Sequence, residues 1–163
     1  MKMKHTQTPW AYTQIVKDHF FNPRNFLRDD EAFEADGTGV VGSPACGDVM
    51  LVAIQVKDGR VRACRWRTFG CASAIASTSM MSVMATEKEG MSLARAKRLK
   101  PEEILERLGG LPERKFHCSV LGQEALREAV LDYERIHTPQ NPLLRRDVHD
   151  PNSSAKGFAS YGK

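Results

Sequence analysis

The feature that most constrains the fold is one amphipathic helix expected near the end of the chain. Apolar side chains recur there at the spacing of a single buried stripe, at Leu121, Ala125, Leu126, Ala129, Val130, Tyr133 and Ile136. The glycine pair at 109–110 and then Pro112 interrupt any preceding helix. The helix is therefore expected to begin close to His117 and Cys118 and to run to about His137.

The expected start of this helix sets His117 beside Cys118. Unpaired backbone N–H groups point outward from a first helical turn, and the helix dipole there favours negative charge. This setting is expected to stabilise the thiolate of Cys118, which would make it a better nucleophile and a better metal ligand. The same pair is also typical of a small buried cysteine beside a capping histidine. The stretch alone leaves both interpretations open.

Length and composition predict one globular domain over residues 10–137, with a disordered leader at 1–9 and an extended or disordered tail at 138–163. The chain has 163 residues, of which 41% are hydrophobic and 27% charged, an ordinary balance for a globular protein. Its formal net charge of +4 is too small to indicate binding to nucleic acid. No apolar run approaches the roughly 18–20 residues that span a membrane, and no secretory apolar segment follows the N-terminus. We therefore expect a cytoplasmic protein.

Between the two ends, the pattern predicts an α+β fold in which a three-stranded antiparallel sheet is packed by helices on one face. The strands are expected at residues 37–43, 49–57 and 61–69, and the other helices at 10–21, 72–85, 92–99 and from 101 onward. Asp58-Gly59 is a hairpin turn of the Asp-Gly type. The apolar phase shifts at Ala63-Cys64, which indicates a bulge and leaves the face of Cys64 open. Alternation with Trp66 favours the core for Cys64.

Four cysteines in a chain without secretory features argue against a disulfide framework and are too dispersed for a local zinc finger. Apart from Cys64, the residues of metal-ligating type lie at three junctions between predicted elements. These are the turn at Cys46 and Asp48, the corner at Cys71 between a strand and a helix, and the helix start at His117 and Cys118.

A three-stranded meander with helices on one face can bring these three junctions to one end of the domain. Three thiolates with a carboxylate or an imidazole would then hold zinc, or iron with sulfide. Iron–sulfur clusters normally prefer four thiolates, so an aspartate or histidine in one position makes a cluster less tightly held. Such a site suits transfer of a cluster better than its permanent storage.

Four blocks of this sequence resemble the IscU/NifU-type family of iron–sulfur cluster assembly scaffolds. They are Asp-His-Phe-Phe-Asn-Pro-Arg-Asn at 18–25, Val-Gly-Ser-Pro-Ala-Cys-Gly-Asp-Val-Met at 41–50, Thr-Phe-Gly-Cys-Ala-Ser-Ala-Ile-Ala-Ser at 68–77 and His-Cys-Ser-Val-Leu at 117–121. The resemblance covers about residues 12–136 and implies a fold of the SufE/IscU type. It also implies a scaffold rather than an enzyme, on which a labile 2Fe–2S cluster is built from iron and from persulfide sulfur supplied by a cysteine desulfurase, then passed to apo-proteins.

The resemblance also implies roles for individual residues. Cys46, Cys71 and Cys118 would be thiol ligands, Asp48 the carboxylate that keeps the site labile, and His117 a neighbouring ligand. Cys118 is expected to accept sulfur first, as a persulfide, because it lies at a helix start on a segment expected to move. The remaining cysteine matches no ligand of the family, in agreement with a structural role.

The sequence departs from the family in the segment that family members present to a dedicated Hsp70-type chaperone. The family motif Leu-Pro-Pro-Val-Lys is replaced here by Leu-Pro-Glu-Arg-Lys at 111–115, which keeps Leu111, Pro112 and Lys115. Binding of such a chaperone is therefore open. The context from 109 to 126 is closer to the N-terminal domain of NifU, and the absence of cysteine after residue 137 indicates a stand-alone scaffold. Whether the chain forms a homodimer is also open.

Two alternatives accompany the scaffold interpretation. A zinc-dependent sulfurtransferase of the SufU type would relay sulfur through a thiol, and residues 77–81 resemble that class. A zinc-stabilised interaction domain would use the thiols only structurally and would unfold without metal. The order His117-Cys118 and the lack of a long insertion before the last helix favour the scaffold.

The cationic run at 95–100 is expected to be a solvated face, with a docking surface for an acidic partner as the alternative.

Overall fold

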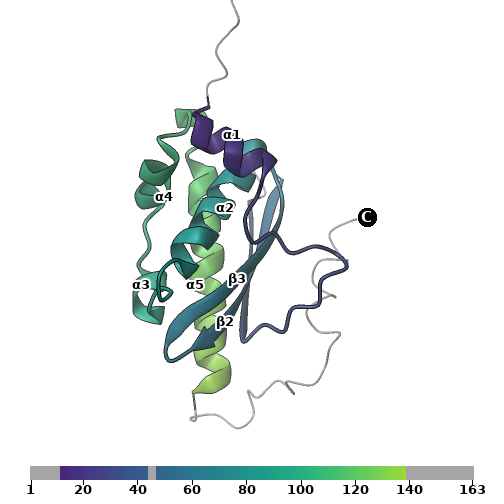
Figure 1. The fold of residues 1–163 in the computed structure, drawn as a ribbon, viewed down its shortest axis with the longest axis vertical. Helices are drawn as coiled ribbons and strands as arrows, with labels where there is room; N and C mark the ends of the chain where they lie inside the picture. Colours follow the sequence, from purple (N-terminus) through teal and green to yellow (C-terminus); the bar gives the residue numbers. More distant parts are fainter. Residues whose placement is uncertain (1–11, 44–46, 139–163) are drawn as a thin grey trace, which may run out of the picture.

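The computed structural model describes residues 12–43 and 47–138, and it has the α+β fold predicted from the sequence. A three-stranded antiparallel sheet in the order β1-β2-β3 packs against a layer of helices (Figure 1). The elements in chain order are α1 (Gln14–Phe21), β1 (Gly37–Ser43), β2 (Asp48–Lys57), β3 (Arg60–Phe69), α2 (Ala72–Thr86), α3 (Leu93–Lys97), α4 (Pro101–Leu108), the 3-10 turn η1 (Glu113–Lys115) and α5 (His117–His137). The predicted leader, most of the predicted tail and Cys46 lie outside the described residues.

Helices α2 and α5 pack directly on the sheet, α4 packs against these two helices, and α3 packs against α5 and contacts β3 (Figure 1). Most of the apolar stripe predicted for α5 is buried: Leu121 is 7% exposed, and Ala125, Leu126, Ala129 and Val130 are fully buried. The last two members, Tyr133 and Ile136, are half-buried. Among the helices of the described ranges, none has the length and apolar character needed to span a bilayer.

The hairpin between β2 and β3 turns at Asp58 and Gly59, as predicted. Both residues have positive φ, 55° and 68°, which is the requirement of a two-residue type I′ turn. Close to this turn the two strands change register, because Val56 pairs with Val61 but the preceding residue, Gln55, pairs with Ala63. Arg62 has no partner on β2 and is the extra residue of a bulge. The bulge therefore lies just before the position that the apolar phase shift indicated.

The bulge decides which way Cys64 faces. Cys64 pairs with Ile54, and the next residue on the same face, Trp66, pairs with Val52. All four side chains lie in the core, and Cys64 is only 2% exposed. Burial raises the pKa of the Cys64 thiol to about 12, so this cysteine is a small apolar core residue at neutral pH.

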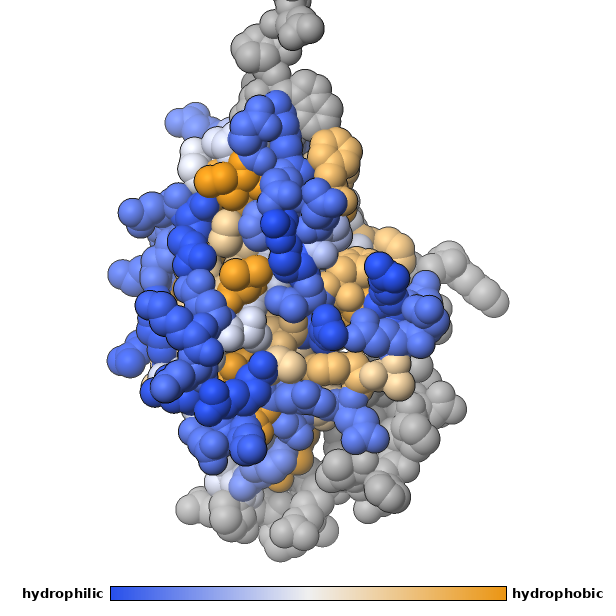
Figure 2. Space-filling model, viewed as in Figure 1, coloured by the Kyte–Doolittle hydropathy of each residue, from blue (hydrophilic) through white to orange (hydrophobic). Residues whose placement is uncertain are grey.

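The cationic run at 95–100 belongs to a hydrophilic surface rather than to an unpaired basic patch. Arg95 forms an ion pair with Glu103, and Lys97 Nζ lies 2.7 Å from Glu134 Oε1. Figure 2 shows hydrophilic residues over the outer side of α3 and α4. Two of the four cationic side chains in the run are thus neutralised by neighbours, which favours the solvated face over a docking surface.

Helix α1 is shorter than predicted and holds a buried histidine. It begins at Gln14 because the Thr13 side chain accepts a hydrogen bond from the backbone N–H of Val16. On its inner side His19 is 7% exposed, with Nδ1 2.8 Å from Ser79 Oγ of α2. Burial lowers the pKa of His19, which keeps the ring neutral at pH 7. His19 therefore joins α1 to α2.

Strand β1 approaches α5 so closely that a side chain at Gly39 has no room. A Cβ placed on Gly39 would lie 2.1 Å from the carbonyl oxygen of Ala125 and 2.6 Å from the backbone nitrogen of Ala129. We expect Gly39→Ala to lower the free energy of unfolding by about 3 kcal/mol, since strand and helix must separate. Chemical denaturation would measure this.

The matched control is Gly42→Ala on the same strand, where the nearest atom to a new Cβ is 3.7 Å away. It should change the free energy of unfolding by less than about 0.5 kcal/mol. A Gly39→Ala variant as stable as the Gly42→Ala variant would contradict the prediction.

Candidate metal centre

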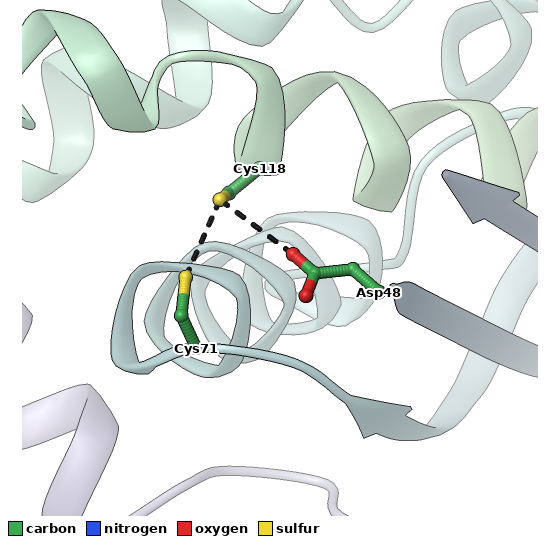
Figure 3. A group of neighbouring side chains, drawn as sticks. All are labelled: Asp48, Cys71 and Cys118. Carbon is green, nitrogen blue, oxygen red and sulfur yellow. Dashed lines mark hydrogen bonds between the residues drawn. The ribbon is translucent and has the colours of Figure 1, made fainter. Parts of the chain in front are cut away.

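Three chain segments that are distant in sequence meet at one end of the sheet. Asp48 is the first residue of β2, Cys71 is the residue that caps the start of α2, and Cys118 is the second residue of α5. Figure 3 shows the three side chains pointing toward one another. Their ligand atoms all lie within 4.8 Å of one another. The structure thus brings together the three junctions that the sequence predicted.

The spacing of these atoms suits a metal ion. Cys71 Sγ lies 3.5 Å from Cys118 Sγ, and Cys118 Sγ lies 4.0 Å from Asp48 Oδ2. A tetrahedral zinc ion with bonds of about 2.3 Å to sulfur and about 2.0–2.2 Å to oxygen would place its donor atoms about 3.5–3.8 Å apart. Small side-chain adjustments would therefore let all three donors bind one ion.

Local backbone geometry explains why these side chains converge. Gly47 has a φ of 69°, which reverses the chain just before Asp48 and which a glycine adopts without strain. In the sheet register Val49 pairs with Phe69, so the preceding residue Asp48 lies beside Gly70 and Cys71. Cys71 makes no side-chain hydrogen bond to the start of its own helix, which leaves its thiol in contact with Cys118.

The electrostatic environment of Cys118 differs from the expectation for a helix start. Its pKa is raised to about 12, first by burial, then by the hydrogen bond to Cys71 and by the negative charges of Cys71 and Asp48. The nearby Lys115 ammonium lowers the pKa, but by less. The expectation that this helix start stabilises the thiolate of Cys118 is therefore wrong. A metal ion would reverse this, because thiols bind metals as thiolates and release their protons.

The physical reason lies in the segment before α5. The turn η1 precedes the helix, and Phe116 has helical backbone angles, φ −56° and ψ −40°. Helix α5 therefore follows η1 without an extended residue at its N-cap, and Cys118 in its first turn is fully buried. Burial outweighs the helix dipole at this position.

The other predicted site residues are not part of this group. His117 is exposed at the first position of α5, and Cys64 lies in the core away from the three donors. Cys46 lies outside the described residues. The ligand roles of Cys46 and His117 therefore stay predictions.

Sequence reasoning did not identify Gly70, which lies against the Asp48 carboxyl group. The one sequence feature that points to Gly70 is its position just before Cys71.

The segment that corresponds to the family's chaperone motif leads directly into the site. Leu111 and Pro112 are half-buried, and Lys115 is the last residue of η1, close enough to Cys118 to affect its pKa. A partner that bound this segment would therefore contact the chain within a few residues of the buried thiol. Chaperone binding itself stays open, as it was from the sequence.

Comparison with known proteins assigns a family over most of the chain. Residues 11–140 match the family described as the NifU-like N terminal domain. The "iron-sulfur cluster assembly scaffold protein IscU 1" of Archaeoglobus fulgidus is 46% identical over 124 residues, which are 76% of this chain and 77% of that protein. The IscU scaffold protein of Escherichia coli K12 is 44% identical over 125 residues, or 76% of this chain and 94% of that protein.

Solved structures share the fold at lower sequence identity. The N-terminal part of a NifU-like protein from Brucella abortus superposes with a TM-score of 0.56 at 20% identity, covering 76% of this chain and 94% of that one. SufU of Fervidobacterium islandicum gives a TM-score of 0.52 at 17% identity, over 74% and 96% of the two chains. At these identities the likeness supports the fold alone.

Proposed function

The chain belongs to the NifU-like N-terminal domain family, and we propose that it is a scaffold on which an iron–sulfur cluster is assembled and then passed on. The observation that carries the proposal is the convergence of two thiols and one carboxylate at one end of the sheet. The cluster is cargo rather than a resident cofactor. The protein holds it and releases it, and no turnover chemistry on a separate substrate is required.

The donor set explains why such a cluster would be released. Thiolates such as those of Cys71 and Cys118 are soft ligands that suit iron–sulfur clusters. The carboxylate of Asp48 is a harder ligand, which an iron–sulfur cluster holds less strongly than a thiolate. A 2Fe–2S cluster bound by these residues, with Cys46 and His117 as the further predicted ligands, is therefore less tightly held than one bound by four thiolates.

Sulfur is supplied as a persulfide by a cysteine desulfurase. The Cys118 thiol loses its proton as its sulfur attacks the outer sulfur of the donor persulfide, the sulfur–sulfur bond of the donor breaks, and the donor leaves as a thiolate that takes up a proton. Cys118 then carries the persulfide. Because Cys118 is fully buried, the start of α5 must move before the donor can reach it. The half-buried Cys71 is the more accessible thiol and is the alternative acceptor.

The partners follow from this role: a sulfur donor, and apo-proteins that accept the cluster. An Hsp70-type chaperone that binds Leu111, Pro112 and Lys115 would act on the segment that leads into Cys118. A cytoplasmic location remains a prediction from the sequence, and formation of a homodimer stays open.

A zinc-dependent sulfur relay is the second candidate, because the spacing of the three donor atoms suits a tetrahedral zinc ion. In that function zinc stays bound while a thiol carries sulfur. The two functions differ in what the protein retains after sulfur transfer, a cluster or a zinc ion.

Anaerobic reconstitution tests the proposal. We expect the protein, mixed with ferrous iron, cysteine and a cysteine desulfurase, to bind about two iron and two sulfide ions per cluster and to show sulfur-to-iron charge-transfer bands. The cluster should then pass to an apo-ferredoxin. Zinc that resists replacement, together with a persulfide but no cluster, would contradict the scaffold and favour the sulfur relay.

A further inference from the structure

Gly70 lies directly against the side chain that the proposed function makes the labile ligand. It connects Phe69, the last residue of β3, to Cys71. A Cβ placed on Gly70 would lie 3.2 Å from Asp48 Cγ, 3.3 Å from Asp48 Oδ1 and 2.9 Å from Ala74 Cβ. Carbon atoms in contact are most stable at about 3.5–4.0 Å. The Asp48 carboxyl group therefore lies in space that any side chain at residue 70 would need.

The backbone does not explain why residue 70 is glycine. Its φ lies outside the left-handed region that favours glycine, so other residues can adopt the same conformation. Gly70 is also exposed to solvent, which leaves room for longer side-chain atoms. Only the first side-chain atom is in conflict, because the chirality of the residue directs Cβ toward Asp48 and Ala74. The constraint on residue 70 is thus the space next to the carboxylate.

We propose that Gly70 is a positioning residue that sets where the Asp48 carboxylate meets the two thiols. The two oxygens of Asp48 have different neighbours. Oδ1 lies against Gly70, and Oδ2 points toward Cys118 Sγ at 4.0 Å (Figure 3). A methyl group at residue 70 displaces the carboxylate and changes the separation between its oxygen and the thiols. The inference rests on the proposed function in taking Asp48 as a ligand.

Zinc alone is a suitable probe, because its binding needs neither sulfur transfer nor cluster assembly. We expect Gly70→Ala to lower the zinc affinity about tenfold, the lower end of the effect of changing residues that orient metal ligands. A competition titration against a chromophoric chelator would measure the affinity. Cobalt in place of zinc adds a spectroscopic readout: the sulfur-to-metal charge-transfer bands should persist while the d–d bands change.

The contact with Ala74 must be separated from the contact with Asp48. Ala74→Gly removes the shorter contact, so Gly70→Ala is also made in an Ala74→Gly background, where only Asp48 opposes the new methyl group. The matched control is Gly42→Ala, at the same end of the sheet, where a Cβ comes no closer than 3.7 Å to another atom. Thermal unfolding of each variant verifies that it is folded before metal is added.

Two comparisons decide the inference. In the Ala74→Gly background, Gly70→Ala should still lower zinc affinity about tenfold, and in an Asp48→Ala background it should have no further effect. The inference would be overturned if the Gly70→Ala, Ala74→Gly double variant bound zinc as tightly as Ala74→Gly alone. It would also be overturned if Gly70→Ala still lowered zinc affinity in the Asp48→Ala background. If the wild-type protein binds zinc in this manner but assembles no cluster, the proposed function fails while the role of Gly70 stands.

Discussion

Cys118→Ser is expected to abolish acceptance of sulfur. Incubated with a cysteine desulfurase and cysteine, the wild-type protein should gain the mass of one sulfur atom on Cys118, and the variant should gain none. The reason is that a serine hydroxyl cannot form the sulfur–sulfur bond of a persulfide. Mass spectrometry of the alkylated protein, after proteolysis to locate the added sulfur, would measure the difference.

Two further variants make this result interpretable. Cys64→Ala removes a thiol that is buried in the core and outside the group of donors, so it should leave persulfide formation unchanged. Cys71→Ser should keep the persulfide on Cys118 but lose the cluster, because it removes one ligand. A persulfide that survives in Cys118→Ser and disappears in Cys71→Ser would show that the half-buried thiol is the acceptor instead.

Asp48→Ala is expected to slow release of the assembled cluster about tenfold while still permitting assembly. The carboxylate is the hardest of the described donors and the one that an incoming acceptor displaces most readily. Without it, the cluster would be held by the other predicted ligands, which are three thiolates and the imidazole of His117. Loss of the charge-transfer bands after addition of a chelator, and transfer to apo-ferredoxin, would give the two rates.

The control for Asp48→Ala is Asp30→Ala, an exposed carboxylate in the loop between α1 and β1 that is not part of the donor group. It should release its cluster at the wild-type rate. Faster release in Asp48→Ala than in Asp30→Ala would show that the carboxylate stabilises the cluster rather than making it labile.

The sequence by itself determined the elements and their order, because those depend on local periodicity. The apolar stripe of α5 repeats at helical spacing, and its residues from Leu121 to Val130 are buried as predicted. The Asp58-Gly59 turn requires two positive φ angles, which this pair adopts readily, and it joins β2 to β3 as predicted. The resemblance in four short blocks identified the family, which the comparisons confirmed.

For the site, the sequence identified which residues to consider, and the tertiary structure decided which of them meet. Asp48, Cys71 and Cys118 converge because the pairing of β2 with β3 and the packing of α5 bring three distant junctions together. His117 precedes Cys118 in the chain yet is exposed, since successive residues on a helix point in different directions.

Only the tertiary structure decided the properties that depend on burial by distant segments. Sequence spacing places Cys118 at a helix start and predicts a lowered pKa, whereas burial beside Cys71 and Asp48 raises it to about 12. The face of Cys64 likewise depends on a one-residue bulge at Arg62. Gly70 is the clearest case, because its importance lies in a contact with Asp48 that no local pattern encodes. Periodicity specifies a helix or a strand, but the charge and space around one atom are set by residues that lie far away in the chain.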